Sequence, residues 1–464
     1  MNIPQLFEQR TRLLMGDALY QTFYNALNEP SPVSIRLNPF KCVHAAVVDN
    51  GGRVEWCRDG YYLNSRPEFT FDPLLHGGVY YVQEAASMFI DCVLRQYVDK
   101  PVTMLDLCAA PGGKTTAARA ALPNGSLLFS NEPVGLRASV LAENVQKFGH
   151  PDVVVTNNYA GDYARSGLLF DVVLTDVPCS GEGMFRKDEG AIAAWSVDNV
   201  NKCSTLQRQI VEDIWPCIAP GGLLIYSTCT YNAEEDERNV AWITKELGGE
   251  LLSVEIDDNW HITGSLIQKV AQPVYRFIPG CTKGEGLFMC VIKKTAVGTG
   301  KTNKQPALKS TVKLPSGWLK NQDDYVGVAE GDVLRAIPRR WAPAYALASK
   351  RLKVLSAGVD VAVVKGKKLI PTQMLALSCA LKDDAFPRVE VDFAQCQRYL
   401  HRDVLTLSDN APRGYVVLTY QNVPIGFVNN LGSRANNLFP QQWRVKSTHV
   451  PNAFEVVTMK QGAL

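Results

Sequence analysis

The sequence predicts an α/β protein whose centre is a parallel β-sheet covered by helices on both faces. Between residues 101 and 292, short apolar runs alternate with segments of helical periodicity. The runs are Met104–Cys108, Leu127–Ser130, Val153–Thr156, Val172–Thr175 and Leu223–Ser227. The helical segments are Leu136–Phe148, Thr205–Ile218 and Glu234–Glu246. Strands that alternate with helices in this way favour a parallel sheet. Residues 284–293 are expected to add a last strand at the edge of that sheet.

The segment before the centre, residues 1–100, is expected to form a small N-terminal domain. Residues 7–14 have a helical pattern, and residues 33–39 read as a strand stopped by Pro39. The central domain is then assigned to residues 101–292.

Three further segments follow the centre. Residues 293–313 hold six lysines and no acid, which predicts a basic linker. Residues 314–385 combine helical and strand patterns and are expected to form a small C-terminal domain. Residues 386–464 read as mostly β, with Val416–Tyr420 and Pro424–Val428 flanking a turn.

Composition restricts the class of protein. Hydrophobic residues make up 46% of the 464 residues, which is enough for a large core. The sequence contains no run of 18 apolar residues, so no membrane span is expected. The first residues do not read as a signal peptide, so we expect a cytoplasmic protein. The 12 cysteines include no Cys-x-x-Cys pair, which argues against a zinc ribbon, and we expect no metal site.

Charge is divided unevenly along the chain. Residues 293–464 hold 25 Lys and Arg against 12 Asp and Glu, a net charge of +13. Subtraction from the totals of 48 and 46 leaves 23 against 34 for residues 1–292, a net charge of −11. Such a division suggests a nucleic-acid-binding part attached to a catalytic part, although basic surfaces also occur without a ligand.

A glycine-containing turn follows the first predicted strand. Small residues at 109–113 let the backbone approach a ligand closely, and the helix that starts there favours a carboxylate or phosphate at its N-terminus. The three-glycine spacing of dinucleotide sites and the full phosphate-loop pattern are both absent. The turn therefore suits the methionine carboxylate of S-adenosylmethionine better than a pyrophosphate.

An acidic residue, Glu132, follows the second predicted strand. A carboxylate at this place can bind both ribose hydroxyls of a nucleoside. Alone, it would be read as a solvated turn residue, but its position one strand after the glycine turn favours a nucleoside site.

Two cysteines come directly after strands: Cys179 in Asp176–Gly183 and Cys229 in Tyr226–Asn232. Ligands of open α/β sheets bind beyond the carboxyl ends of the strands, where both thiols fall. A free cysteine is usually a buried structural thiol, but here Asp176 and the glycine turn accompany the pair. We therefore predict one shared site.

These segments resemble the RNA 5-methylcytosine methyltransferases of the Nol/Nop/Sun family, and more closely its RsmF-like (YebU-like) branch. The resemblance rests on Cys108–Lys114, Asp176–Gly183, Tyr226–Asn232 and the lead-in Tyr81–Ser87. It covers residues 1–292 well, and the tail resembles the two C-terminal domains of the branch. The combination of Asp-x-Pro-Cys with Thr-Cys is its most specific part.

The resemblance implies a fold and an activity. The fold would be a Rossmann-like class I methyltransferase domain with a small N-terminal domain and C-terminal α+β and PUA-like β domains. The protein would transfer a methyl group from S-adenosylmethionine to carbon 5 of cytosine in RNA. The branch suggests bacterial 16S ribosomal RNA or the 30S particle as the partner of a monomeric enzyme.

The resemblance also implies the role of each catalytic residue. Cys229 would add to carbon 6 of cytosine, which activates carbon 5 toward the methyl group. Asp176 would contact the cytosine edge, either accepting from the exocyclic amine or donating to the ring nitrogen. Cys179 would act in release of the product. Lys114 would bind the cofactor carboxylate or raise the thiolate fraction of Cys229.

The same comparison yields a set of cofactor-binding residues. After the third strand, where the family carries an acid, this chain has Asn157 and Asn158, and one of the two is expected to hydrogen-bond adenine. The complete set is Cys108, Ala109, Ala110, Pro111, Gly112, Gly113, Lys114, Glu132, Asn157 and Asp176.

Three alternatives remain open. A DNA cytosine-5 methyltransferase would use Pro178–Cys179 and a later Glu-Asn-Val, but Glu143–Val145 comes too early and Cys229 would have no role. A catalytically silent ribosome-assembly factor would not need both thiols. Transfer RNA is the alternative substrate.

Overall fold

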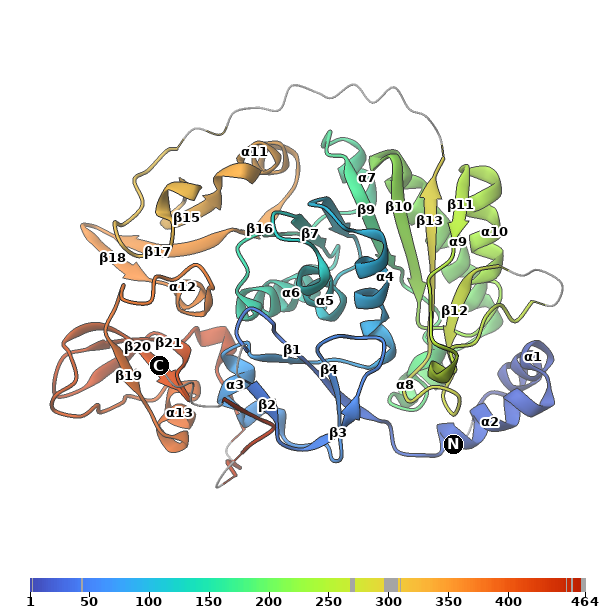
Figure 1. The fold of residues 1–464 in the computed structure, drawn as a ribbon, viewed down its shortest axis with the longest axis horizontal. Coiled ribbons are helices and arrows are strands. Elements are labelled where there is room, and N and C mark those ends of the chain that lie inside the picture. Colours follow the sequence, from blue (N-terminus) through green and yellow to red (C-terminus); the bar gives the residue numbers. More distant parts are fainter. Residues whose placement is uncertain are drawn as a thin grey trace.

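The structure is a computed structural model and describes residues 1, 3–42, 45–267, 272–295, 308, 310–447, 449–451 and 454–459. Most of the expected basic linker at 293–313 lies outside these residues. Its first two lysines belong to strand β13 (Leu287–Lys294). Figure 1 shows a central sheet with one group of elements on each side.

The central sheet has nine strands within the described residues. Its parallel part has the order β10-β9-β6-β7-β8. These strands are β6 (Thr103–Asp106), β7 (Leu127–Asn131), β8 (Val153–Thr156), β9 (Phe170–Asp176) and β10 (Ile218–Thr228). All five strands expected from apolar runs are therefore confirmed.

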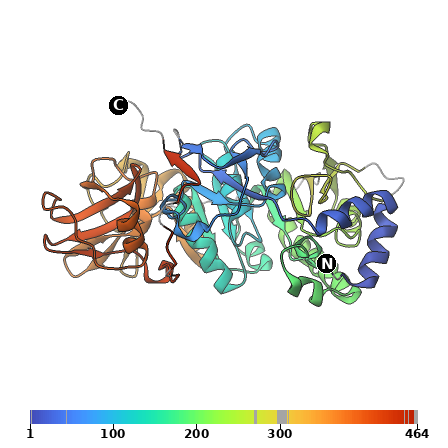
Figure 2. The same ribbon diagram turned by 90° about the horizontal axis from the view of Figure 1, so that it is seen from below.

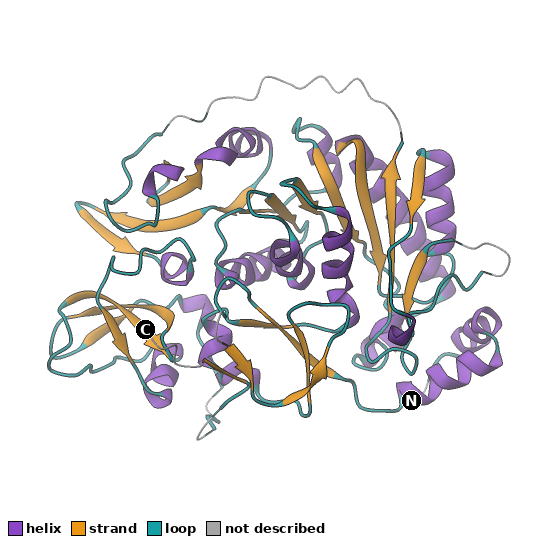
Figure 3. Cartoon of the chain, viewed as in Figure 1, coloured by secondary structure: helices purple, strands orange, loops and turns teal. Residues whose placement is uncertain are grey.

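Helices cover both faces of this sheet, as Figure 3 shows. Met104, Leu128 and Leu174 face one layer, whereas their neighbours Leu105, Phe129 and Val173 face the other. The first layer is α4 (Phe89–Tyr97), α5 (Gly113–Ala121) and α6 (Gly135–Phe148). The second is α7 (Ala160–Ala164), α9 (Val197–Ile214), α10 (Glu237–Glu246) and α11 (Ala342–Arg351).

The expected edge strand is an interior strand, which corrects the prediction. β13 pairs antiparallel with β10, with β11 (Gly249–Leu252) and with β12 (Val274–Phe277). Residues 287–292 are all buried. A continuous apolar run of this kind suits a strand that is covered on both faces.

The N-terminal part contains a helical hairpin and a small sheet. Helices α1 (Gln5–Met15) and α2 (Asp17–Leu27) pack against Phe185, Trp195 and Tyr231 beside the central domain. The sheet has the order β3-β4-β1-β5. Its strands are β1 (Val33–Leu37), β3 (Asn50–Arg53), β4 (Gly60–Leu63) and β5 (Tyr80–Val82). The short helices α3 (Pro73–His76) and α8 (Glu189–Ala194) lie outside this sheet.

Two further four-stranded sheets follow in the C-terminal part. The first contains β14 (Tyr325–Glu330), β15 (Val333–Pro338), β17 (Val359–Lys365) and β18 (Lys368–Pro371), followed by α12 (Gln373–Leu377). The second contains β19 (Arg388–Glu390), β20 (Gly414–Tyr420), β21 (Val423–Asn430) and β22 (Ala435–Asn437), with α13 (Phe393–Leu400). The expected turn between β20 and β21 is confirmed, and its residues Gln421 and Asn422 have φ of 49° and 64°.

Two strands cross the domain boundaries that the sequence suggested. β16 (Val354–Ala357), from the segment 314–385, pairs antiparallel with β8 and extends the central sheet. β23 (Val457–Met459), near the end of the chain, pairs with β2 (Ala45–Val47) of the N-terminal part. Figure 2 shows this last strand, in red, lying beside the blue N-terminal strands. The parts of the chain are therefore joined by strand pairing as well as by linkers.

Among the described residues, no helix combines the length and the apolar character that crossing a membrane requires.

Candidate active site

The candidate site lies where β6, β7, β9 and β10 end, along the carboxyl edge of the parallel strands. This is the edge at which open α/β sheets bind ligands. Every strand that the sequence linked to function ends here, so the fold gathers the predicted residues on one side of the sheet.

The predicted cofactor turn joins β6 to α5. Gly112 precedes the helix as its N-cap and has φ of 113°, a conformation that favours glycine. Ala109 N–H donates to the carbonyl of Asn131 at 2.8 Å, and the Asn144 amide donates to the carbonyl of Pro111 at 2.8 Å. The turn is thus held from β7 on one side and from α6 on the other.

Asp106, the last residue of β6, is a site residue that we did not predict. Its Oδ2 accepts from Thr115 Oγ1 at 2.6 Å, while the buried Oδ1 has no partner among the described residues. Burial raises the pKa of this carboxyl group to about 7. An acid inside the apolar run 104–108 was the available signal, because a buried charge in a strand needs a partner. The orphaned oxygen beside the turn and the start of α5 fits a zwitterionic cofactor with an amino and a carboxylate group.

Glu132 follows β7, as predicted, and its side chain is 2% exposed. Oε1 accepts from Val134 N–H at 3.0 Å, and Arg137 Nη2 lies 3.5 Å from Oε2. Each carboxylate oxygen can accept more than one hydrogen bond, so Glu132 keeps acceptor capacity for a ribose.

Asn157 has a different set of partners from those expected. Its amide donates to the carbonyls of Glu132 and Pro133, both at 2.9 Å, and its oxygen accepts from Lys353 Nζ at 2.9 Å. These bonds fix the turn that carries Glu132. The expected contact with adenine stays a prediction. Both N–H groups of the Asn157 side chain already donate to backbone carbonyls.

The two thiols meet at the ends of β9 and β10. Cys179 Sγ lies 2.9 Å from Cys229 Sγ. Hydrogen bonding to Cys229 and burial raise the pKa of Cys179 well above the usual range. Cys179 therefore resists deprotonation as long as the Cys229 thiol lies beside it.

An ion pair lies at the end of β9. Lys114 Nζ binds Asp176 Oδ2 at 2.8 Å, and Ser227 donates to Asp176 Oδ1 at 3.0 Å. Burial opposes the charge on Lys114, but the Asp176 carboxylate outweighs it and holds the pKa of the ammonium above its usual value. This ion pair lies beside the thiols, in agreement with a site that stabilises charge on its substrate.

The DNA methyltransferase reading finds no support in the fold. Glu143–Val145 lies inside α6, where Glu143 binds Lys147 at 2.6 Å and Val145 is buried. This segment serves the helix and its packing.

Comparison with known families agrees with this geometry. The family model described as 16S rRNA methyltransferase RsmB/F matches residues 96–293. Residues 3–85 match the N-terminal domain of 16S rRNA methyltransferase RsmF, and residues 386–445 match the methyltransferase RsmF PUA domain.

Curated relatives match over nearly the whole chain. The ribosomal RNA small subunit methyltransferase F of Serratia proteamaculans (strain 568) is 29% identical over 476 residues, which is 95% of this chain and 96% of the relative. The protein of the same name from Vibrio cholerae (strain M66-2) is 27% identical and covers 95% and 98%.

Solved structures share the fold. A methyltransferase homolog protein from Pyrococcus horikoshii has a TM-score of 0.54 and 24% identity, covering 63% of this chain and 95% of its own. NSun6 from the same organism has a TM-score of 0.53 and 18% identity, covering 63% and 98%. The RsmB/F model and the two RsmF domain models match in the expected order along the chain, and these findings support the RsmF branch of the RsmB/F methyltransferase family.

Proposed function

We propose that this protein methylates carbon 5 of cytosine in 16S ribosomal RNA, with S-adenosylmethionine as methyl donor and Cys229 as covalent nucleophile. The observation that carries the proposal is the meeting of Cys179, Cys229 and the Lys114–Asp176 ion pair beside the glycine turn. A methyl donor alone would need only the turn and Glu132. Two adjacent thiols suit a reaction that first adds a nucleophile to the ring and then removes it.

The cofactor would be held by the turn 108–113, the N-terminus of α5, Asp106 and Glu132. When bound, S-adenosylmethionine supplies an electrophilic methyl group. Asp106 would face its amino group, Glu132 would bind its ribose, and the α5 N-terminus would face its carboxylate.

The cytosine would lie between the thiols and Asp176. After losing its proton to solvent, the Cys229 thiolate would add to carbon 6, and the electron pair of the ring double bond would move to carbon 5. Carbon 5 would then take the methyl group from S-adenosylmethionine, which would leave as S-adenosylhomocysteine. Because Asp176 is paired with Lys114, we favour the carboxylate that accepts from the exocyclic amine over an acid that donates to the ring nitrogen.

Cys179 would then release the product. Hydrogen bonding to Cys229 is the largest cause of its raised pKa. Once Cys229 is bonded to carbon this cause is gone, so Cys179 can lose its own proton to solvent and accept the proton of carbon 5. The electron pair of that C–H bond restores the double bond and expels Cys229.

The proposal extends to the partner and its place. The C-terminal part, which carries the matched PUA domain, would hold ribosomal RNA, either naked or within the 30S particle. The enzyme would act as a monomer in the cytoplasm, where ribosomal RNA is assembled.

The test is methylation in a purified system. The protein and S-adenosylmethionine are incubated with naked 16S RNA, with 30S particles lacking the modification, or with transfer RNA. Nucleosides are then measured by mass spectrometry. We expect 5-methylcytidine in one of the ribosomal arms. Product in the transfer-RNA arm alone would overturn the ribosomal substrate, and no product in any arm would favour a silent assembly factor.

A further inference from the structure

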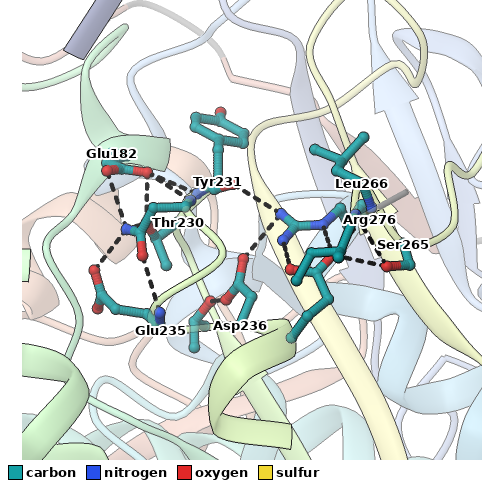
Figure 4. A network of polar contacts seen from close by, with 12 residues as sticks. Glu182, Thr230, Tyr231, Glu235, Asp236, Ser265, Leu266 and Arg276 are labelled. Atoms are coloured by element: carbon teal, nitrogen blue, oxygen red, sulfur yellow. Dashed lines mark hydrogen bonds and ion pairs between the residues drawn. The ribbon is translucent and has the colours of Figure 1, made fainter. Parts of the chain in front are cut away.

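A buried carboxylate lies beneath the loop that carries Cys229. Glu182 is 2% exposed, and no Lys or Arg of the described chain lies within ion-pair distance of it. Its Oε2 accepts from Thr230 Oγ1 at 2.6 Å, Tyr231 N–H at 2.8 Å and Asn232 N–H at 3.0 Å. Figure 4 shows Thr230 and Tyr231 beside the carboxylate of Glu182.

The other oxygen of Glu182 is also saturated. Oε1 accepts from Trp195 Nε1 at 2.9 Å and from the Asn232 amide at 3.0 Å. The negative charge is thus held by neutral donors, most of them on the three residues after Cys229. A buried charge is costly unless it is hydrogen-bonded. These bonds therefore hold both Glu182 and residues 230–232 in place.

Glu182 also belongs to the loop that carries the other thiol, three positions after Cys179. The next residue, Gly183, donates its N–H to the carbonyl of Cys229 at 2.8 Å. A Cβ at Gly183 would lie 2.7 Å from that carbonyl oxygen, so the close approach requires glycine. Glu182 and Gly183 therefore fasten the Cys179 loop to the Cys229 loop at neighbouring points.

A second set of hydrogen bonds, made by Glu235 and Arg276, lies deeper in the protein. Glu235 accepts from Ser180 N–H at 3.0 Å and from the Asn232 amide at 2.8 Å. Beyond it, Arg276 donates to the carbonyl of Tyr231 at 3.1 Å and lies 2.9 Å from Asp236 Oδ2, as Figure 4 shows. The base of the loop is therefore anchored independently, whereas the backbone N–H groups of Tyr231 and Asn232 donate to Glu182.

We propose that Glu182 is a positioning residue that holds the Cys179 and Cys229 sulfurs at the relative positions that the reaction requires. This inference rests on the proposed function, because it concerns the thiol pair of that reaction. The glutamate does not touch the substrate. It acts through the loop 230–232, and a loop displaced by about 1 Å would lower the rate of attack roughly a hundredfold.

The test is Glu182→Gln, which keeps the volume of the side chain. The amide nitrogen cannot accept hydrogen bonds, so it leaves buried N–H groups of the loop without a partner. The rate of covalent capture is measured on RNA containing 5-fluorocytidine, at saturating RNA and across pH. We expect capture about 100-fold slower at saturation, with RNA and cofactor affinities nearly unchanged and an altered pH profile.

Glu234→Gln is the matched control. Glu234 belongs to the same loop region, but among the described residues its side chain binds the side chains of Arg10 and Arg238, at 2.7 and 3.2 Å. The substitution should change capture no more than roughly threefold, because these partly exposed ion pairs do not contact the residues that follow Cys229 directly. Equal rates for Glu182→Gln and Glu234→Gln would overturn the inference.

Thr230→Val covers the case in which Glu182→Gln loses cofactor binding and has not folded. It removes one donor to Glu182 without changing side-chain size, and we expect capture roughly tenfold slower. Capture at the wild-type rate in this variant would overturn the inference as well. Absence of adduct with the wild-type protein would instead contradict the proposed function itself.

Discussion

The sulfur atoms of Cys179 and Cys229 lie 2.9 Å apart, at the ends of two neighbouring parallel strands. At this distance the charge of one thiol affects the other, and a single substrate ring can meet both. Their roles can be separated because one sulfur attacks and the other takes part in release.

The first prediction separates these roles. Cys229→Ala should abolish both methyl transfer and covalent capture, because no other described thiol contacts Cys179. Cys179→Ala should still attack cytosine but release it slowly, so RNA-linked protein should accumulate. Denaturing gels with labelled RNA would measure the adduct. The assignment is reversed if Cys179→Ala forms no adduct while Cys229→Ala still transfers methyl groups.

The second prediction concerns Glu132. Loss of a charge-assisted hydrogen bond costs about 1.5–3 kcal/mol, so Glu132→Ala should weaken cofactor binding roughly ten- to a hundredfold. Glu132→Gln keeps an acceptor for Val134 N–H and separates loss of the turn from loss of the charge. Glu143→Ala on α6 is the control. Calorimetry that finds the wild-type affinity in Glu132→Ala would rule out the ribose contact.

The third prediction concerns the pH dependence of stability. Asp106 titrates near pH 7 in the folded protein, above its unfolded value of about 3.9. Its contribution to stability is therefore fully present below pH 4 and is lost as the pH rises through 7. Asp106→Asn removes this loss, so without cofactor the variant should gain a few kcal/mol on the wild type between pH 5 and 8. Urea unfolding at pH 5 and pH 8 measures the free energy of unfolding of the variant and the wild type. The same difference between them at both pH values would contradict the prediction.

The fourth prediction concerns RNA binding by the basic tail. Deletion of residues 293–464 would remove β16 from the central sheet and cut β13, so point substitutions are the cleaner test. Arg444 and Lys446 are exposed and closely follow Trp443, whose ring lies 5.3 Å from Lys147 Nζ on α6. They therefore come directly after a point at which the tail meets the catalytic domain.

Arg444→Ala with Lys446→Ala should weaken RNA binding and reduce the slope of log K against log salt by about 1.5. The reason is that fewer counterions are released on binding when two phosphate contacts are lost. Cofactor affinity should not change. Lys245→Ala with Lys293→Ala removes the same charge from exposed positions elsewhere. An RNA affinity and slope equal to those of the wild type would show that this part of the tail is an ordinary solvated surface.

The sequence predicted the parallel strands because each is a short apolar run between helical segments. It also predicted that Asp176, Cys179 and Cys229 would meet, since parallel strands end on one edge. It misplaced β13, because position along the chain suggested an edge while burial on both faces requires an interior strand. Nothing in Val354–Ala357 identified β8 as its partner, because strand pairing over such a separation depends on the whole fold.

Within the site, motif residues were easier to find than those that support them. Glu182 lay inside a recognised motif, but four of its five hydrogen bonds depend on a loop about fifty residues away. Asn157 was expected at a ligand, whereas its bonds fix the turn of Glu132. Residue type and spacing indicate chemistry, but they do not show which polar groups are already satisfied.

The pairing of β8 with β16 has a consequence for synthesis on the ribosome. The outer edge of β8 is complete when Thr156 emerges, but its partner strand emerges about two hundred residues later. At translation rates of about 5–20 residues per second, that edge stays open for roughly 10–40 s. An unpaired edge can join another chain, so the nascent protein needs either a chaperone or a transient cover during this interval. The β2–β23 pair forms later still, because β23 emerges about four hundred residues after β2.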